Sequence, residues 1–195
     1  MKFGSLLVAF LFIWGSLVYG AHHESQGKID DAIRDKIERV KKLGLHPLVV
    51  KAVREQNAKK MSLEKIKSID NEWKSTKELT PFKKSLQESL VGRFLKNKVN
   101  SNKGIYNEAF LTDNQGANVT AYPATSDYWQ GDETKWTASF NNSNGKIYIG
   151  PVEFDDSTGT NATQISVPVV DNGATIGVLV IGVKLSFIES RNMKK

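Results

Sequence analysis

Aromatic rings and carboxylates gather in one short stretch of the chain, from Asp127 to Asp155. Flat rings can form the walls of a small-molecule pocket, and a few fixed polar groups can orient the molecule inside it. A carboxylate can pair with a cation, and the face of an indole attracts one. These residue types predict a binding site, and the residues expected to form it are Asp127, Tyr128, Trp129, Trp136, Tyr148 and Asp155.

The groups that catalysis requires are sparse. The sequence has no cysteine and no G-x-S-x-G elbow, and no histidine follows His46 to act as a base. The adjacent acids Asp132–Glu133 and Asp155–Asp156 can in principle do acid–base work on a sugar, but such loop acids are usually solvated or capping groups. We therefore predict no enzymatic activity. The less favoured alternative is a periplasmic hydrolase that uses the acids near Asp155.

Metal binding has one signal, near the start of the chain. The three histidines are His22, His23 and His46, and none has a metalloprotease or deaminase spacing. Cleavage after Gly20 would expose the amine of Ala21, two amides and the His23 imidazole, a set that can hold copper or nickel in a square plane. A polar leader at a cleavage point explains the same residues, and we predict no metal and no cofactor.

Residues 1–21 have the pattern of an export signal. Lys2 gives a positive start, Leu6–Val18 is apolar apart from Gly15 and Ser16, and small residues precede the expected cleavage after Gly20 or Ala21. The alternative is an uncleaved membrane anchor, because the apolar run is only slightly shorter than the roughly 20 residues that span a bilayer. Both interpretations place the rest of the chain outside the cytoplasm, in the periplasm or the medium.

Charge divides the chain into two parts. Residues 22–103 carry 20 Lys and Arg against 11 Asp and Glu, whereas residues 104–190 carry 3 against 10. The basic part can meet an anionic partner, but solvated helix faces are the simpler explanation. We expect no nucleic-acid partner, because the chain has an export signal and its basic part lacks the interleaved aromatic residues of single-strand binders.

The basic part predicts helices. Ile29, Ile33, Ile37 and Val40 recur at helical spacing in a long leading helix that ends near Gly44. Further helices are expected to begin at Pro47, after Ser62 and at Thr80–Pro81. In the last of these, the apolar residues repeat every fourth position, and they are Phe82, Leu86, Leu90 and Phe94.

The acidic part predicts a sheet. Asn172–Gly173 between two apolar β-branched runs is a strong hairpin signal. An aromatic loop at 123–131 and a short helix at 132–140 are expected to interrupt the strands. The fold class is thus α+β, with a helical N-terminal half before a five-stranded, antiparallel, meandering sheet. The expected strands are 105–112, 117–121, 146–154, 163–170 and 175–185.

The order of three runs, DYWQGDETKW, KIYIGPVEFD and ISVPVVDNGATIGVLVIGV, resembles a single-Cache domain, the PAS-like extracytoplasmic sensor module of bacterial receptors. The resemblance covers about residues 105–188, and the preceding helices match the long leading helix of such modules more loosely. It implies that the aromatic segment and the short helix cross the sheet, with a small molecule bound between them. The expected parts are a signal peptide at 1–21, a helical region at 22–103 and a Cache-like sheet at 104–190.

The resemblance also implies a function. We expect an exported sensor without its own output domain, which binds a small ligand, signals through a membrane receptor or kinase partner, and can form a homodimer. In amino-acid-binding Cache domains an arginine holds the ligand carboxylate, but residues 104–190 contain no arginine, which leaves Lys135, Lys146 or Arg93 for that role.

From the acidic charge, we predict an amine or amino acid as ligand, with a small carboxylate as the alternative. A module that binds protein or dimerises, without any ligand, is the other hypothesis.

Overall fold

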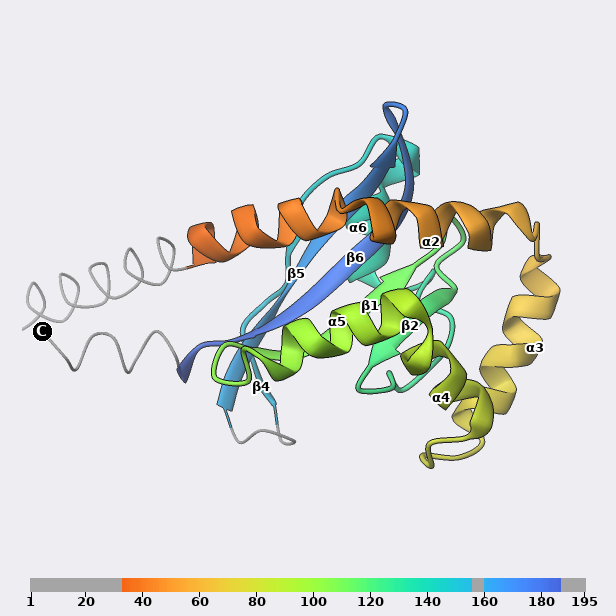
Figure 1. Cartoon of the computed structure of the whole chain (residues 1–195), viewed down its shortest axis with the longest axis horizontal. Coiled ribbons are helices and arrows are strands. Elements are labelled where there is room, and N and C mark those ends of the chain that lie inside the picture. The colour runs from red at the N-terminus through yellow and green to blue at the C-terminus, as the bar shows by residue number, and fades with distance from the viewer. Residues whose placement is uncertain (1–32, 156–159, 187–195) are drawn as a thin grey trace, which may run out of the picture.

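The computed structural model describes residues 33–155 and 160–186, and these form an α+β fold (Figure 1). Helices occupy the described chain up to Asn100, and the sheet follows from Tyr106. The predicted export signal, the His22–His23 site and the start of the leading helix lie outside the described residues. Within the described part, no helix is both long and apolar enough to cross a membrane.

Capping residues explain where several helices begin. The helix of residues 33–44 is followed after a short turn by α2 (Pro47–Ala58), where the His46 Nδ1 accepts a hydrogen bond from the Leu48 N–H at 3.2 Å. Ser62 caps α3 (Leu63–Lys74), and its hydroxyl accepts from the Lys65 N–H. Thr80 caps α4 (Pro81–Glu88) in the same way. Each side chain satisfies an N–H that the helix itself leaves unpaired.

The predicted fourth helix is in fact two helices. α4 ends before Ser89, and α5 (Leu90–Asn100) begins after it with the Ser89 hydroxyl accepting from the Gly92 N–H at 3.0 Å. The every-fourth-residue stripe is therefore not one buried face. Leu90 is 63% exposed, and α5 instead buries Val91, Leu95 and Val99. The Ser89 hydroxyl thus accepts a hydrogen bond from a backbone N–H that would donate to a carbonyl in a continuous helix, and the helix is interrupted there.

The sheet is antiparallel, but it is not the simple meander that the sequence predicted. The order is β2-β1-β6-β5-β3, with β4 also paired to β5. The last two strands of the sequence, β5 and β6, thus occupy the centre, because β6 pairs with both β1 and β5. The strands are β1 (Tyr106–Thr112), β2 (Asn118–Tyr122), β3 (Tyr148–Ile149), β4 (Glu153–Asp155), β5 (Thr160–Asp171) and β6 (Ala174–Lys184).

Two strand predictions have different outcomes. The hairpin is confirmed, because Asn172 and Gly173 both adopt positive φ and connect the paired residues Asp171 and Ala174. The predicted strand at 146–154 is instead divided into β3 and β4. Between them, Pro151 has no N–H to donate to the sheet, so regular pairing stops there.

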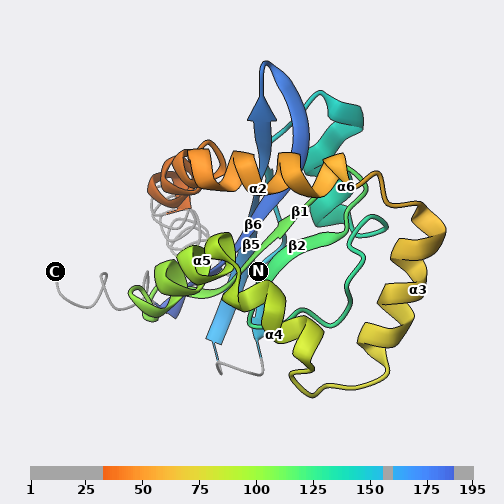
Figure 2. The same ribbon diagram turned by 45° about the vertical axis from the view of Figure 1, so that its right-hand side comes forward.

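Helices cover the two faces of the sheet unequally. The helices of residues 33–58 and α5 lie side by side on one face, with α3 and α4 at one end (Figure 2). The short helix α6 (Thr134–Phe140) lies on the other face. The larger core forms on the first face, and its fully buried members include Val40, Val49, Val53, Leu95, Ala109, Leu111, Ile165, Leu179 and Ile181.

Candidate functional site

A cavity of about 640 Å³ lies on the α6 face of the sheet. Such a volume is typical of small-molecule sites. The cavity takes residues from the sheet, from the start of α6, from the segment after β2 and from the β3–β4 region. Its lining comprises Asn107, Glu108, Pro123, Ala124, Glu133, Thr134, Lys135, Tyr148, Gly150, Pro151, Glu153, Phe154, Ala162, Thr163, Gln164 and Gly182.

Three neighbouring strands place polar groups at the sheet side of this cavity. Gly182 on β6 pairs in register with Glu108 on β1 and with Gln164 on β5. The Gln164 Nε2 donates a hydrogen bond to the Glu108 Oε1 at 2.7 Å. A Cβ on Gly182 would lie 2.7 Å from the Glu108 Cγ, so the glycine provides the space in which the glutamate lies. The polar floor therefore depends on one residue without a side chain.

Packing of α6 leaves its first residues beside the cavity. Trp136 and Phe140 stack with their ring centroids 4.7 Å apart and cover Phe110 and Val180 of the sheet. Lys135 lines the cavity, and its Nζ lies 5.7 Å from the centroid of the Phe110 ring. The apolar residues of α6 thus fix the helix on the sheet, while its N-terminal polar residues border the empty space.

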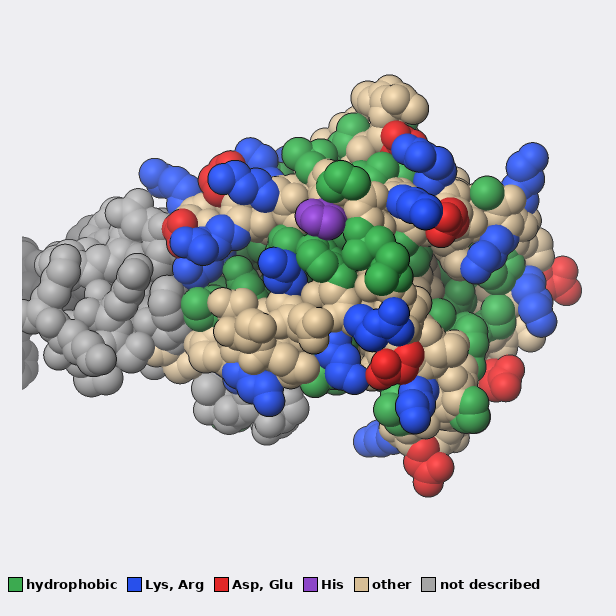
Figure 3. All heavy atoms as spheres, in the orientation of Figure 1, with side chains coloured by type: hydrophobic (Ala, Val, Ile, Leu, Met, Phe, Trp, Pro, Cys, Tyr) green, Lys and Arg blue, Asp and Glu red, His purple; other side chains and the backbone are tan. Residues whose placement is uncertain are grey.

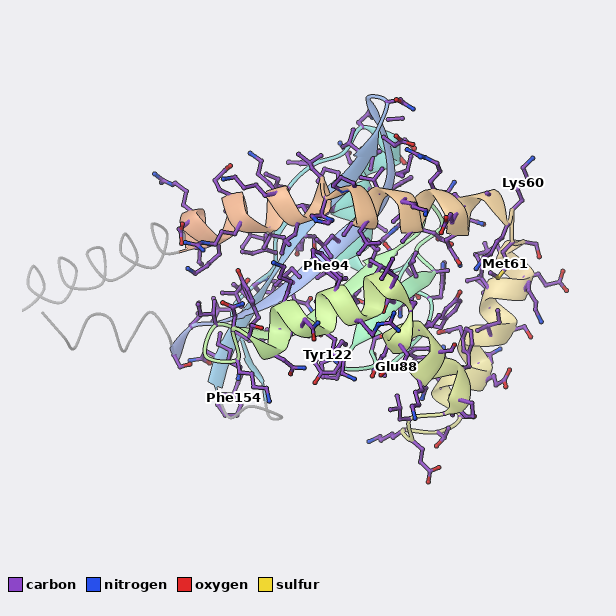
Figure 4. All side chains as sticks on the ribbon, viewed as in Figure 1. Lys60, Met61, Glu88, Phe94, Tyr122 and Phe154 are labelled. Atoms are coloured by element: carbon purple, nitrogen blue, oxygen red, sulfur yellow. The ribbon has the colours of Figure 1, made fainter. Side chains whose placement is uncertain are left out.

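The β3–β4 region closes another side. The Thr163 hydroxyl donates to the Gly150 carbonyl at 2.8 Å, which holds the segment between the two strands against β5. Phe154 on β4 (Figure 4) lines the cavity and is still 62% exposed, so it lies where the cavity meets solvent. An apolar group in the opening would therefore be partly shielded from water by this ring.

The six residues predicted from the sequence are not brought together. Of the five whose side chains the structure describes, Tyr148 alone is part of the cavity lining. Trp136 packs on the sheet, and its Nε1 points to the Asp113 carbonyl oxygen at 3.4 Å. Asp155 belongs to β4, but its side chain is not among those that the structure describes.

Asp127, Tyr128 and Trp129 lie against α3 instead. The Asp70 carboxylate on α3 accepts hydrogen bonds from the Tyr128 N–H at 2.8 Å and the Trp129 N–H at 3.0 Å. The Trp129 Nε1 donates to the Gln115 carbonyl at 2.8 Å. The Asp127 carboxylate accepts from the Gln130 side chain. These contacts give the aromatic loop an anchoring role.

Tyr128 is among the most deeply buried large side chains, at 1% exposure. Its ring forms a triangle with those of Trp73 and Phe82, with centroid distances of 5.8 and 5.7 Å to them and 6.1 Å between the other two. Burial, with a smaller effect from the Asp113 charge, raises the pKa of the Tyr128 hydroxyl to about 12. Burial also raises the pKa of Asp113, against the lowering effect of the Gln115 and Ala117 backbone N–H groups. In both cases burial makes the charged form less favourable, because charge is poorly solvated there.

The three basic residues considered for a ligand carboxylate have different positions. Lys135 lines the cavity. Lys146 is exposed and outside the lining, and the Arg93 guanidinium donates to the Glu88 carbonyl between α4 and α5 (Figure 4). Within residues 33–155 and 160–186, no cluster of three or more His, Asp or Glu side chains is arranged to hold a metal.

Sequence reasoning missed Glu108, Gln164 and Glu133 as cavity residues. The available signal was a charged residue inside an apolar strand, since Glu108 interrupts the run YNEAFLT. Gln164 stands on β5 immediately before the run ISVPVV, which is mostly apolar. Burying such side chains is costly without a partner or water, so a polar residue in a strand marks a place where the sheet is not covered by apolar packing.

These observations decide the fold. Helices cover one face of an antiparallel sheet, a short helix crosses the other, and a cavity lies between that helix and the strands. The chain has an α+β fold with a PAS/Cache-like, antiparallel sheet.

Several solved structures are similar to this chain. One is a domain of a putative sensory box/GGDEF protein from Vibrio parahaemolyticus, with 16% identity, a TM-score of 0.48, and coverage of 90% of this chain and 61% of that one. Another is the sensor domain of the V. cholerae histidine kinase DctB, with 17% identity, a TM-score of 0.40, and coverage of 71% and 58%. A third is the ligand-binding domain of the Pseudomonas aeruginosa amino-acid chemoreceptor PctC in complex with GABA, with 16% identity, a TM-score of 0.43, and coverage of 80% and 62%.

The chain thus spans about three fifths of the length of these domains. No family model and no curated protein matches the sequence.

Proposed function

We propose that this protein is an extracytoplasmic sensor that binds an amine-bearing small molecule in the cavity between α6 and the sheet. It performs no chemistry on the ligand and passes the signal to a membrane receptor or kinase. The supporting observation is the cavity itself, which is large enough for a small metabolite and has Glu108 at its sheet side. A carboxylate that meets an ammonium group in such a site forms a charge-assisted hydrogen bond.

Thermal unfolding in the presence of a ligand panel tests this proposal, because a ligand that binds only the native state raises the melting temperature. We expect amines or amino acids to raise it and plain dicarboxylates to have little effect. Glu108→Gln should weaken the affinity for amines at least about tenfold, and amines should then raise the melting temperature less. The matched control is Glu55→Gln on α2, whose exposed carboxylate lies 3.8 Å from the Lys51 Nζ and outside the cavity. Stabilisation by acetate, lactate or another plain carboxylate alone would contradict the amine assignment.

Export is part of the proposal. Residues 1–21 have the composition of a signal peptide, and the sensor requires an extracytoplasmic position to meet its ligand. Mass spectrometry of the protein recovered from cells should give an N-terminus at Ala21 or His22. A full-length mass in the membrane fraction would instead support the retained anchor.

A protein-interaction or dimerisation module is the second candidate, and exposed apolar side chains favour it. Leu45 is 57% exposed beside the first helix, and Leu90 is exposed at the start of α5. Hydrophobic side chains gather between these helices on the molecular surface (Figure 3). Removal of the residues before Leu45 tests a homodimer formed by the leading helix. If the truncated protein remains folded and its mass in solution corresponds to the same number of subunits as before, that interface is excluded.

A further inference from the structure

The charge around the cavity is strongly unbalanced. Among the residues of 33–155 and 160–186, three glutamates, Glu108, Glu133 and Glu153, line it, against one basic residue, Lys135. Among the residues that the structure describes, no Lys or Arg forms an ion pair with any of the three. The cavity therefore carries an excess of two negative charges when all four groups are ionised.

The three carboxylates belong to different elements. Glu108 lies on β1, Glu133 immediately precedes α6, and Glu153 lies on β4 near the opening. Lys135 cannot neutralise all of them, and its Nζ lies near the Phe110 ring. Negative charge thus enters the cavity from three separate elements of the fold.

Apolar surface lines the same cavity as these charges. Tyr148 and Phe154 provide ring faces, and the remaining apolar lining is small and rigid. Methylene groups gain free energy when they leave water for such surface, and aromatic faces attract ammonium groups. That apolar lining also includes Pro123, Ala124, Pro151 and Ala162.

Ligands differ in how much of this negative charge they neutralise. A zwitterionic amino acid leaves the excess of two negative charges unchanged and brings a carboxylate close to three others. A monoamine neutralises one charge, whereas a diamine neutralises both. Like charges that remain together in a partly desolvated site are unfavourable, so the most complete neutralisation binds best.

We infer that the cavity accepts a linear diamine or polyamine, with ammonium groups at separate glutamates and methylene groups against Tyr148 and Phe154. This inference rests on the proposed function, since it names the ligand class of the same cavity. It differs from a general amine preference because it requires at least two positive charges on one flexible apolar chain.

A matched four-carbon series tests the inference by calorimetry on the purified protein. Putrescine carries two ammonium groups, n-butylamine one, γ-aminobutyrate one ammonium and one carboxylate, and succinate two carboxylates. We expect putrescine to bind at least about tenfold more tightly than n-butylamine, and the other two to bind more weakly still. Affinity for putrescine should also fall more steeply with salt than affinity for n-butylamine, because more charge is paired.

Charge-neutralising variants assign the effect to this cavity. Glu108→Gln, Glu133→Gln and Glu153→Gln should each reduce the preference for putrescine over n-butylamine several-fold, and Glu55→Gln should leave it unchanged. Melting temperatures near that of the native protein would show that the variants fold. Equal binding of putrescine and n-butylamine, or tightest binding of γ-aminobutyrate, would overturn the diamine inference and leave the sensor proposal intact. No binding of any of the four compounds would overturn the inference, and failure of the wider panel as well would overturn the proposed function.

Discussion

Glu108 and Gln164 meet across an intervening strand. The Gln164 Nε2 donates to the Glu108 Oε1 at 2.7 Å, although the two residues lie on β5 and β1 with β6 between them. Gly182, the β6 residue in register with both, has no side chain to separate them. The polar floor of the cavity is thus a three-strand feature that depends on a glycine.

Two glycines of β6 should respond differently to the same substitution. In Gly182→Ala, the new Cβ would meet the Asn107 Oδ1 at 2.1 Å and the Glu108 Cγ at 2.7 Å, and these side chains can move. We expect a small loss of stability and a clear loss of amine binding by calorimetry.

Gly177→Ala is the matched control on the same strand. Its Cβ would lie 2.2 Å from the backbone carbonyl oxygen of Thr112, which cannot move without distorting β1. We expect it to lower the free energy of unfolding by about 2–3 kcal/mol or more. Equal effects of the two substitutions on both stability and binding would contradict the role of Gly182 in the cavity.

Asp70 should be important for stability although it lies on a helix outside the cavity. The residue is 4% exposed, and its carboxylate accepts hydrogen bonds from the N–H groups of Tyr128 and Trp129. Asp70→Ala leaves two N–H groups without this acceptor, at about 1–3 kcal/mol each. Urea unfolding should therefore show a loss of about 2–6 kcal/mol. Glu72→Ala, at an exposed position of the same helix, should change the free energy of unfolding by less than about 0.5 kcal/mol.

The raised pKa of Tyr128 predicts that the folded protein loses stability at high pH. Its pKa is about 12 in the folded protein, against 10.0 as the usual value, so the unfolded chain releases the phenolic proton first. Stability from this group is complete below pH 10 and is lost progressively up to about pH 12, with a total of roughly 3 kcal/mol at most. Denaturant unfolding at several pH values should show a shallower alkaline decline in Tyr128→Phe. Tyr122→Phe, which leaves Tyr128 in place, should retain the decline, and identical profiles for the two variants would refute the assignment.

Ser89 separates two helices, and its removal should be measurable. Its hydroxyl accepts from the Gly92 N–H and donates to the Leu86 carbonyl at 2.8 Å. Ser89→Ala should lower the free energy of unfolding by about 1 kcal/mol, the usual cost of losing an N-cap. Ser85→Ala, whose hydroxyl donates within α4 at an exposed position, serves as the control. A larger effect at Ser85 than at Ser89 would argue against the capping role.

Local sequence patterns were sufficient for much of the fold. Ser62 and Thr80 marked the beginnings of helices because a hydroxyl that accepts from a nearby N–H acts within a few residues. Asn172–Gly173 marked the hairpin because both positions require positive φ, which is also a local property. The same reasoning failed at Ser89, where an apolar repeat predicted one helix and the hydroxyl divided it.

The order of the strands and the members of the cavity were decided by tertiary structure. The aromatic loop has the composition of a binding site, but Asp70 and Trp73 of α3 hold its Tyr128 outside the cavity. The sequence does not indicate which partner its N–H groups will find. Glu108, Gln164 and Gly182 become neighbours only because β6 inserts between β1 and β5. Alternation along a strand fixes which residues share a face, whereas pairing between distant strands fixes which of them meet. Local patterns therefore predicted most helix boundaries, the hairpin and the α+β class, whereas the site depends on contacts between elements that are far apart in the chain.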